Sequence, residues 1–197
     1  IIKYFYPSFL KKMQKNLVMF YKTTVKNLLV MAAILTLFGC KSNADLPTVK
    51  HLDVKQYAGL WYEIARLPNS FEKGLDCTTA NYTLLENGKI EVKNKGRKAA
   101  KNNEISDITG TAWVPNPDFP ARLKVRFFWP FAGDYWVIAL GDNYEYALVG
   151  APNRKYLWIL GREKTMDEAT YSKLVTLAKE KGFDTSLLER INQDCPS

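Results

Sequence analysis

Histidine and cysteine are scarce in this sequence. Its only histidine is His51, and its only cysteines are Cys40, Cys77 and Cys195. A metal site, or a nucleophile with a histidine and an acid, draws on several such side chains close together. Glu63 is a candidate buried acid, but one carboxylate supplies no mechanism. We therefore expect no metal, no cofactor and no catalytic residues.

Long apolar runs are also missing. The apolar run over 28–38 has 11 residues, whereas a membrane-spanning helix needs about 20. Lysines precede the run and Gly39-Cys40 follows it, which is typical of a secretory signal. Leu37 to Cys40 resembles the bacterial lipobox, whose cysteine is diacylated. We predict a signal peptide over 1–39 (with 1–18 as an upstream extension), a lipidated tether over 40–50 and a folded domain over 51–197.

Acidic residues are absent before Cys40, and this absence explains much of the net charge of +8. Six lysines lie in that segment, so the rest of the chain has 22 basic and 20 acidic residues. The basicity therefore belongs mainly to the targeting segment, and we expect no nucleic-acid partner.

Export would place Cys77 and Cys195 in an oxidising compartment, where such a pair tends to form a disulfide. A metal site and a reactive thiol are the alternatives, and a structural disulfide is favoured over both.

From residue 58 to 162 the chain alternates β-branched and aromatic segments with Gly, Pro, Asn and Asp. This pattern predicts strands over 59–67, 77–85, 89–96, 106–114, 121–129, 134–141, 144–150 and 156–162. Short turns between consecutive strands predict an all-β fold, an eight-stranded antiparallel up-and-down barrel, because closure removes exposed sheet edges. An amphipathic helix is expected over 167–181, packed outside the barrel, with a capping box at Thr165 and Glu168.

Gly59-Leu60-Trp61 at the start of the first strand resembles the Gly-x-Trp signature of lipocalins. Arg162 lies where that family has an arginine packed across the Trp. The segments 123–131, 135–140 and 156–160 resemble the bacterial lipocalins, many of which are lipidated outer-membrane proteins. The resemblance implies a barrel that binds, and transports or stores, a small hydrophobic ligand. It also implies anchoring at the outer membrane, most simply on its periplasmic face.

Alternation of side chains predicts which residues face the barrel interior if Trp61 points inward. The ligand-lining residues expected on this basis are Glu63, Ala65, Ala80, Tyr82, Val92, Asn94, Ile108, Gly110, Leu123, Val125, Phe127, Tyr135, Val137, Ala139, Val149, Tyr156 and Trp158. Trp61 and Arg162 are expected to stabilise the fold without contacting ligand.

Basic residues Arg97, Lys98 and Lys101 are expected at the barrel mouth, beside the apolar segment 129–131. This pairing favours a fatty acid or a lysophospholipid as ligand, with its acyl chain inward. One alternative is a barrel filled by its own side chains that binds another protein of the envelope. A lipocalin-fold isomerase is a less favoured alternative, and homodimer formation is left open.

Overall fold

A computed structural model describes residues 46–195, which belong to one compact unit beginning at Asn43. That unit contains the whole sheet, both hydrophobic clusters and the disulfide, so it holds every contact that defines the fold. No helix within the described range is long and apolar enough to cross a bilayer. The predicted lipidation site, Cys40, lies outside the described residues.

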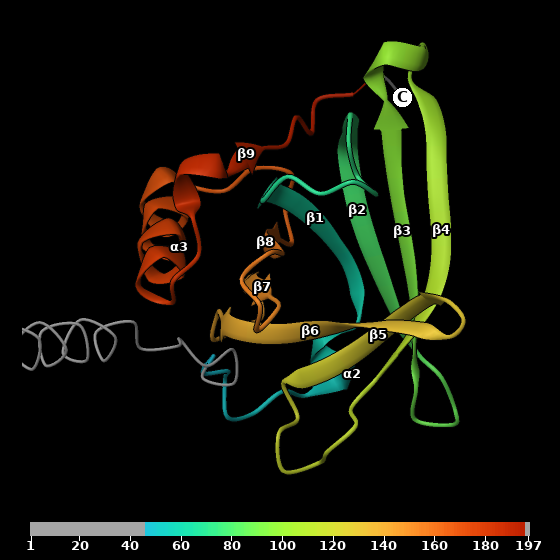
Figure 1. Ribbon diagram of the computed structural model, residues 1–197, viewed down its shortest axis with the longest axis vertical. Coiled ribbons are helices and arrows are strands. Elements are labelled where there is room, and N and C mark those ends of the chain that lie inside the picture. The colour runs from blue at the N-terminus through green and yellow to red at the C-terminus, as the bar shows by residue number, and fades with distance from the viewer. Residues whose placement is uncertain (1–45, 196–197) are drawn as a thin grey trace, which may run out of the picture. The chain divides into compact units, whose positions relative to one another are not determined.

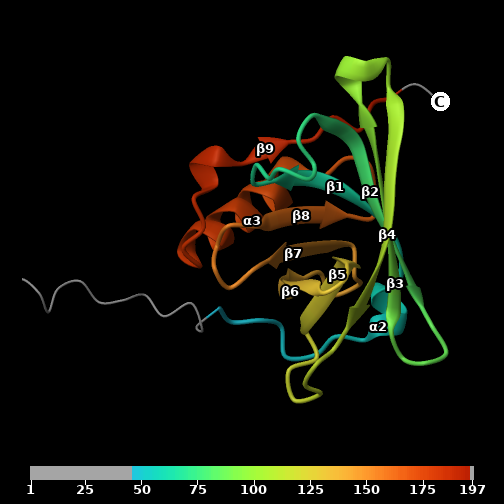
Figure 2. The same ribbon diagram turned by 45° about the vertical axis from the view of Figure 1, so that its right-hand side comes forward.

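Eight consecutive antiparallel strands form a closed barrel, which confirms the predicted fold class (Figures 1 and 2). Strand β1 pairs with both β2 and β8 and thereby closes the sheet. The strands are β1 (Gly59–Arg66), β2 (Leu75–Leu84), β3 (Ile90–Lys98), β4 (Glu104–Trp113), β5 (Arg122–Phe128), β6 (Phe131–Leu140), β7 (Tyr146–Gly150) and β8 (Leu157–Gly161). Each begins and ends within three residues of its predicted limits.

The two ends of the barrel are built differently. The short helix α2 (Val54–Tyr57) lies at one end, capped by the Asp53 carboxylate, together with the connections 85–89, 114–121 and 141–145. At the other end lie the turn between β5 and β6 and the connections 67–74, 99–103 and 151–156. The 3₁₀ turn η2 (Ala99–Lys101) is part of the connection between β3 and β4. We call the end with α2 the closed end and the opposite end the mouth.

Trp61 and Arg162 hold the closed end together. The Trp61 side chain is fully buried, and its Nε1 donates to the Tyr57 carbonyl at 2.8 Å. The Arg162 guanidinium lies 3.9 Å from the Trp61 ring centroid and donates to the carbonyls of Leu60, Gln56, Tyr57 and Ala58. These contacts tie the lead-in segment and β1 to the residue that follows β8, as the resemblance implies.

Helix α3 (Glu168–Glu180) packs on the outside of the barrel (Figure 2). Its Leu174 and Ala178 are buried against Leu148 of β7 and Ile159 of β8 in an outer hydrophobic cluster. The helix is capped by Asp167, which accepts from the Thr170 amide, and the cap expected at Thr165 was wrong by two residues. Leu46 is also fully buried in this cluster. The folded part therefore begins by Leu46, earlier than the boundary expected at 51.

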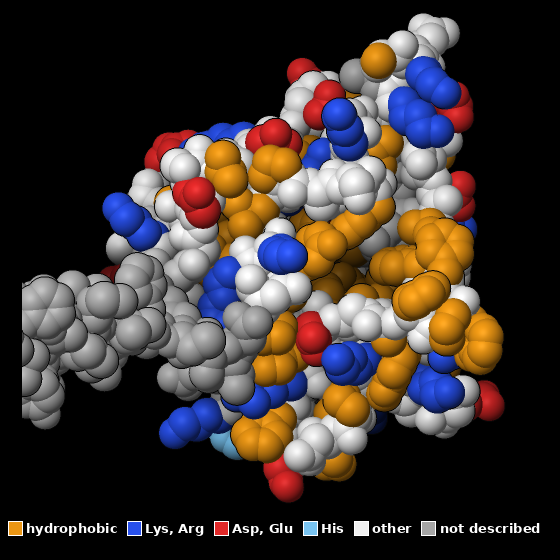
Figure 3. Space-filling model, in the orientation of Figure 1, with side chains coloured by type: hydrophobic (Ala, Val, Ile, Leu, Met, Phe, Trp, Pro, Cys, Tyr) orange, Lys and Arg blue, Asp and Glu red, His pale blue; other side chains and the backbone are white. Residues whose placement is uncertain are grey.

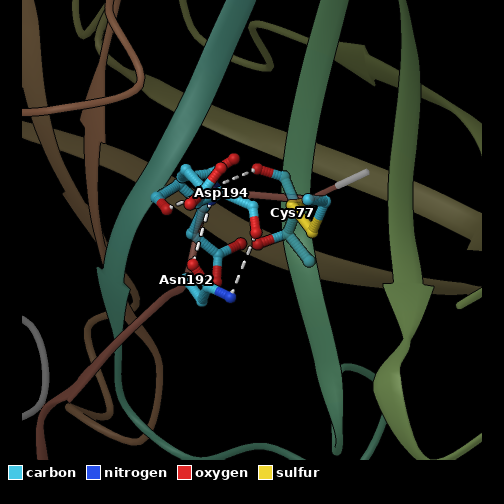
Figure 4. Close-up of a disulfide and its surroundings, with 7 residues drawn as sticks. Cys77, Asn192 and Asp194 are labelled. Atoms are coloured by element: carbon cyan, nitrogen blue, oxygen red, sulfur yellow. Dashed lines mark hydrogen bonds between the residues drawn. A yellow bond between two sulfur atoms is a disulfide. The ribbon is translucent and has the colours of Figure 1, made fainter. Parts of the chain in front are cut away.

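The C-terminal segment runs back across the barrel wall after the 3₁₀ turn η3 (Thr185–Leu187). A two-residue strand, β9 (Glu189–Arg190), pairs with Ala65 and Arg66 of β1, and the sequence did not reveal it. The predicted disulfide between Cys77 and Cys195 is present, and the Cys77 amide donates to the Asn192 carbonyl (Figure 4). Gln193 Nε2 donates to the carbonyls of Glu63 and Thr78. The tail thus fastens β1 to β2.

Replacing both Cys77 and Cys195 by serine should lower the free energy of unfolding by about 2–5 kcal/mol, because the bridge closes a long loop. Urea unfolding of the 43–197 fragment measures this change. Reductant should shift the wild-type midpoint by a similar amount and leave that of the double variant unchanged. Equal midpoints for the wild type and the variant would contradict a stabilising role.

Candidate ligand-binding site

The floor of the barrel interior is a connected layer of tyrosines above Trp61. The Tyr135 hydroxyl lies 2.7 Å from that of Tyr57 and 2.8 Å from that of Tyr82. The Tyr57 ring also packs on Trp61, with ring centroids 4.9 Å apart. Burial raises the pKa of all three phenols well above the ordinary value, so they stay neutral. This end of the barrel is therefore filled, and its tyrosine layer carries no charge.

Ten of the predicted lining residues belong to the hydrophobic cluster inside the barrel or pack against it, with their side chains facing inward as expected. They are Ala80, Tyr82, Val92, Leu123, Val125, Phe127, Tyr135, Val137, Val149 and Trp158. The interior wall is therefore mainly apolar.

The register of β3 and β4 places three more predicted residues on the interior face. Ile108 lies opposite Asn94, and Gly110 opposite the buried Val92. A Cβ at Gly110 would meet the Phe127 ring at 2.6 Å, so only glycine lets β5 approach β4 here. The Asn94 Oδ1 is buried and has no hydrogen-bond partner among residues 46–195. Asn94 therefore offers an acceptor inside the barrel.

Two predicted lining residues, Ala65 and Ala139, face outward, so strict alternation was wrong for them. Both pack in the outer cluster against α3. The register with the neighbouring strand shifts by one residue between Glu63 and Ala65, and again between Val137 and Ala139. Each shift is a β-bulge, and the extra residue reverses the facing of everything after it.

The bulge in β1 also turns Arg66 inward, where it forms a buried charged cluster with Glu63 and Glu72. Arg66 Nη1 donates to Glu63 Oε1 at 2.7 Å, and Nη2 donates to the Glu72 and Leu75 carbonyls. Glu72 Oε2 accepts from Asn69 Nδ2 and from Trp158 Nε1. All three charged residues are at least nine-tenths buried. The cluster ties the 67–74 connection down to the barrel wall at the mouth.

Burial and the nearby Glu72 carboxylate raise the pKa of Glu63 from its ordinary value near 4.5 to about 8, and Arg66 only partly offsets this. The folded state therefore favours the protonated form of Glu63.

Aromatic side chains border the mouth above this cluster. Tyr156, a predicted lining residue, stacks on Trp158 with ring centroids 6.0 Å apart, and Phe71 lies 5.7 Å from Tyr156. Figure 3 shows a recess in the space that β1, β2 and β6 enclose in Figure 1, with mostly hydrophobic side chains around it. The candidate site is this recess, between the tyrosine floor and the aromatic mouth.

Two open grooves lie on the outside of the barrel. One, of about 500 Å³, is lined by Ile64, residues 164–166 and residues 190–194, and the other, of about 420 Å³, lies beside the 67–74 connection. Both are shallow and bordered by charged side chains. The interior recess is the better site for an apolar molecule, because its walls are apolar and shielded from water.

Sequence reasoning missed three residues of the site, namely Tyr57, Arg66 and Glu72. Tyr57 lies four residues before Trp61 at the end of helix α2, and that spacing was an available signal. Alternation from the inward Trp61 would turn Arg66 outward, and Glu72 lies in a connection with no regular pattern. No local signal in the sequence marks the bulge that brings these two together.

Raising the pH from about 5 to about 9 should lower the free energy of unfolding of the 43–197 fragment by several kcal/mol. Glu63 binds its proton more tightly in the folded state than in the unfolded state. Its contribution to the free energy of unfolding is therefore full below pH 4.5 and is lost as the pH rises through about 8. Glu63→Gln imitates the protonated form and should flatten this dependence. Urea unfolding of both proteins across this pH range measures the difference. Identical pH profiles would contradict the assignment.

Comparisons with known proteins agree with this geometry. The model of the lipocalin-like domain matches residues 52–193. The outer membrane lipoprotein Blc of Vibrio cholerae is 39% identical over 84% of this chain and 96% of its own length. Temperature-induced lipocalin-1 of Arabidopsis thaliana is 41% identical over 76% of this chain and 83% of its own length.

Among solved structures, the cockroach allergen Per a 4 superposes with a TM-score of 0.59 at 26% identity, covering 75% of this chain and 93% of the allergen. The similarity to the bacterial proteins supports a lipid-anchored location at the outer membrane. Lipocalins are generally proteins that bind and transport small hydrophobic ligands. With a family model that spans the whole barrel, the chain belongs to the lipocalin family.

Proposed function

We propose that the barrel holds one acyl chain of a fatty acid or a lysophospholipid, with the polar head at the mouth. The observation that carries this proposal is the apolar recess above a filled floor. Its walls come from residues such as Val92, Val125 and Val149, which offer no charge to a ligand. Such a space suits a slender hydrocarbon chain.

The polar groups inside the barrel favour a neutral tail over a buried charge. The polar groups of the Glu63–Arg66–Glu72 cluster are hydrogen-bonded within the protein. A second carboxylate placed beside it would lose its hydration without gaining a free cation. The head of an anionic lipid therefore belongs outside the cluster, at the mouth.

The mouth can receive such a head. The segments 67–74, 97–104, 129–133 and 151–156 contain six basic and two acidic residues, and one of the acids is the buried Glu72. Arg97, Lys98 and Lys101, expected at the mouth from the sequence, lie at the end of β3 and in η2. Lys98 also forms an ion pair with Glu104 at 3.1 Å.

The names of relatives fit a role in lipid handling at the cell envelope. The bacterial relatives are named outer membrane lipoproteins, and mouse apolipoprotein D is 38% identical over 76% of this chain and 82% of its own length. We propose that Cys40 carries the lipid anchor, that 1–39 is the signal peptide, and that the domain lies on the periplasmic face. Binding there would serve storage or transport of a membrane-derived lipid.

Asn94→Trp should fill the recess and weaken binding of an anthroyloxy-labelled fatty acid by at least tenfold, because Asn94 faces the interior. Lys93→Trp is the matched control, since Lys93 is the exposed neighbour on the same strand. Its affinity should stay within twofold of the wild type. Fluorescence titration of the 43–197 fragments measures binding, and thermal unfolding confirms that both variants fold.

Two results would contradict the proposal. Equal affinities for Asn94→Trp and the wild type would place the ligand outside the recess. Failure of the wild type to bind would favour the alternative of a filled barrel that recognises another envelope protein.

A further inference from the structure

The turn between β5 and β6 carries three strongly exposed aromatic side chains. Phe128, Trp129 and Phe131 are 69%, 81% and 79% exposed, and neither hydrophobic cluster of the described residues includes them. We call these three residues the aromatic tip. We propose that the mouth of the barrel docks on an anionic bilayer surface and that the aromatic tip inserts into it. This contact is separate from the lipid anchor and does not depend on the identity of the ligand.

Exposed apolar surface is concentrated at the mouth. The five most exposed large hydrophobic side chains of residues 46–195 are the aromatic tip, Phe71 and Ile105, and all five lie at that end. Figure 3 shows hydrophobic side chains gathered over the turn that Figure 1 places at the end of β5 and β6. Exposed apolar side chains cost free energy in water, so such a concentration marks a contact surface.

The charges of the connections differ between the two ends of the barrel. The mouth connections 67–74, 99–103, 129–130 and 151–156 contain four basic residues, Lys73, Lys101, Arg154 and Lys155, and one acidic residue, the buried Glu72. The closed-end connections 85–89, 114–121 and 141–145 contain one basic residue, Lys89, and four acidic residues, Glu86, Asp118, Asp142 and Glu145. An anionic surface therefore attracts the mouth and repels these connections, which orients the barrel before contact.

The shape of the tip favours a bilayer over a protein partner. Three side chains on one hairpin turn form a small protruding surface, whereas a stable protein interface buries about 800 Å² on each partner. Aromatic rings are favoured at the interface between lipid headgroups and acyl chains. Pro130, in the turn itself, has no backbone N–H that would need a partner there. A bilayer accepts such a tip without a matching cavity.

Docking in this orientation would bring the opening of the recess to the bilayer surface. The aromatic tip and Phe71 lie on the side of the molecule through which the recess opens. With the mouth against the membrane, an acyl chain could pass between bilayer and barrel without crossing bulk water. The basic segments would remain at the level of the headgroups.

Co-sedimentation of the 43–197 fragment with vesicles tests the proposal, because this fragment lacks Cys40 and the apolar run. Vesicles of phosphatidylcholine with about a third phosphatidylglycerol should bind the wild type, and binding should weaken as salt is added. F128S/W129S/F131S should lose at least tenfold in affinity. The matched control L84S/L85S/F119S removes three exposed apolar residues at the closed end and should bind within twofold of the wild type.

Trp129→Phe locates the contact. This variant keeps an aromatic side chain and should still bind, but quenching of tryptophan fluorescence by brominated acyl chains should fall to a small fraction of the wild-type value. Unchanged quenching would overturn the insertion of the tip. Equal loss of binding in the tip and control variants would also overturn the proposal, as would equal binding to pure phosphatidylcholine vesicles.

Two further measurements separate membrane docking from ligand binding and from self-association. The triple tip variant should retain binding of the labelled fatty acid in solution, so failure of docking and failure of ligand binding are distinguishable. Sedimentation velocity without vesicles should show a monomer. A dimer that dissociates in the tip variant, together with no vesicle binding by the wild type, would assign the tip to self-association and overturn the proposal.

Discussion

The barrel depends on the contact between Arg162 and Trp61 at its closed end. One guanidinium lies over the indole and donates to five backbone carbonyls, joining the lead-in segment, β1 and the 141–145 connection to the end of β8. Gly59 takes a positive φ of 93° where a Cβ would approach the Arg162 side chain at 3.4 Å. Because this end is closed and filled with tyrosines, the proposed ligand would enter the barrel interior from the mouth, past the polar and aromatic groups there.

Two of the four register shifts in the barrel limit what the sequence could predict. Alternation predicted the strands and the facing of ten interior residues, because charges alternate with apolar side chains on β3 and β5. It failed after Glu63 and after Val137, where one extra residue reverses the facing of Ala65 and Ala139. The apolar stretches around these positions would look alike in either register. The pairing that selects the bulge comes from strands distant in sequence.

The same bulge creates the polar part of the site. It brings Arg66 inward to meet Glu63 and Glu72, which stabilises the 67–74 connection at the mouth. Sequence reasoning identified Glu63 as a buried acid and could not supply its partners. Burial raises the pKa of Glu63, and the hydrogen bonds of Arg66 and Glu72 are made within the protein, so the cluster offers no free partner to a ligand. The basic residues that the sequence located at the mouth would contact the charged head of the proposed ligand.

Native mass spectrometry can show whether the recess holds a lipid. The 43–197 fragment would be exported in its own host, purified without detergent, and measured before and after solvent extraction. We predict a mass increment of one fatty acid or lysophospholipid per chain that disappears on extraction. A bare polypeptide mass, with no lipid in the extract, would contradict lipid binding in the barrel.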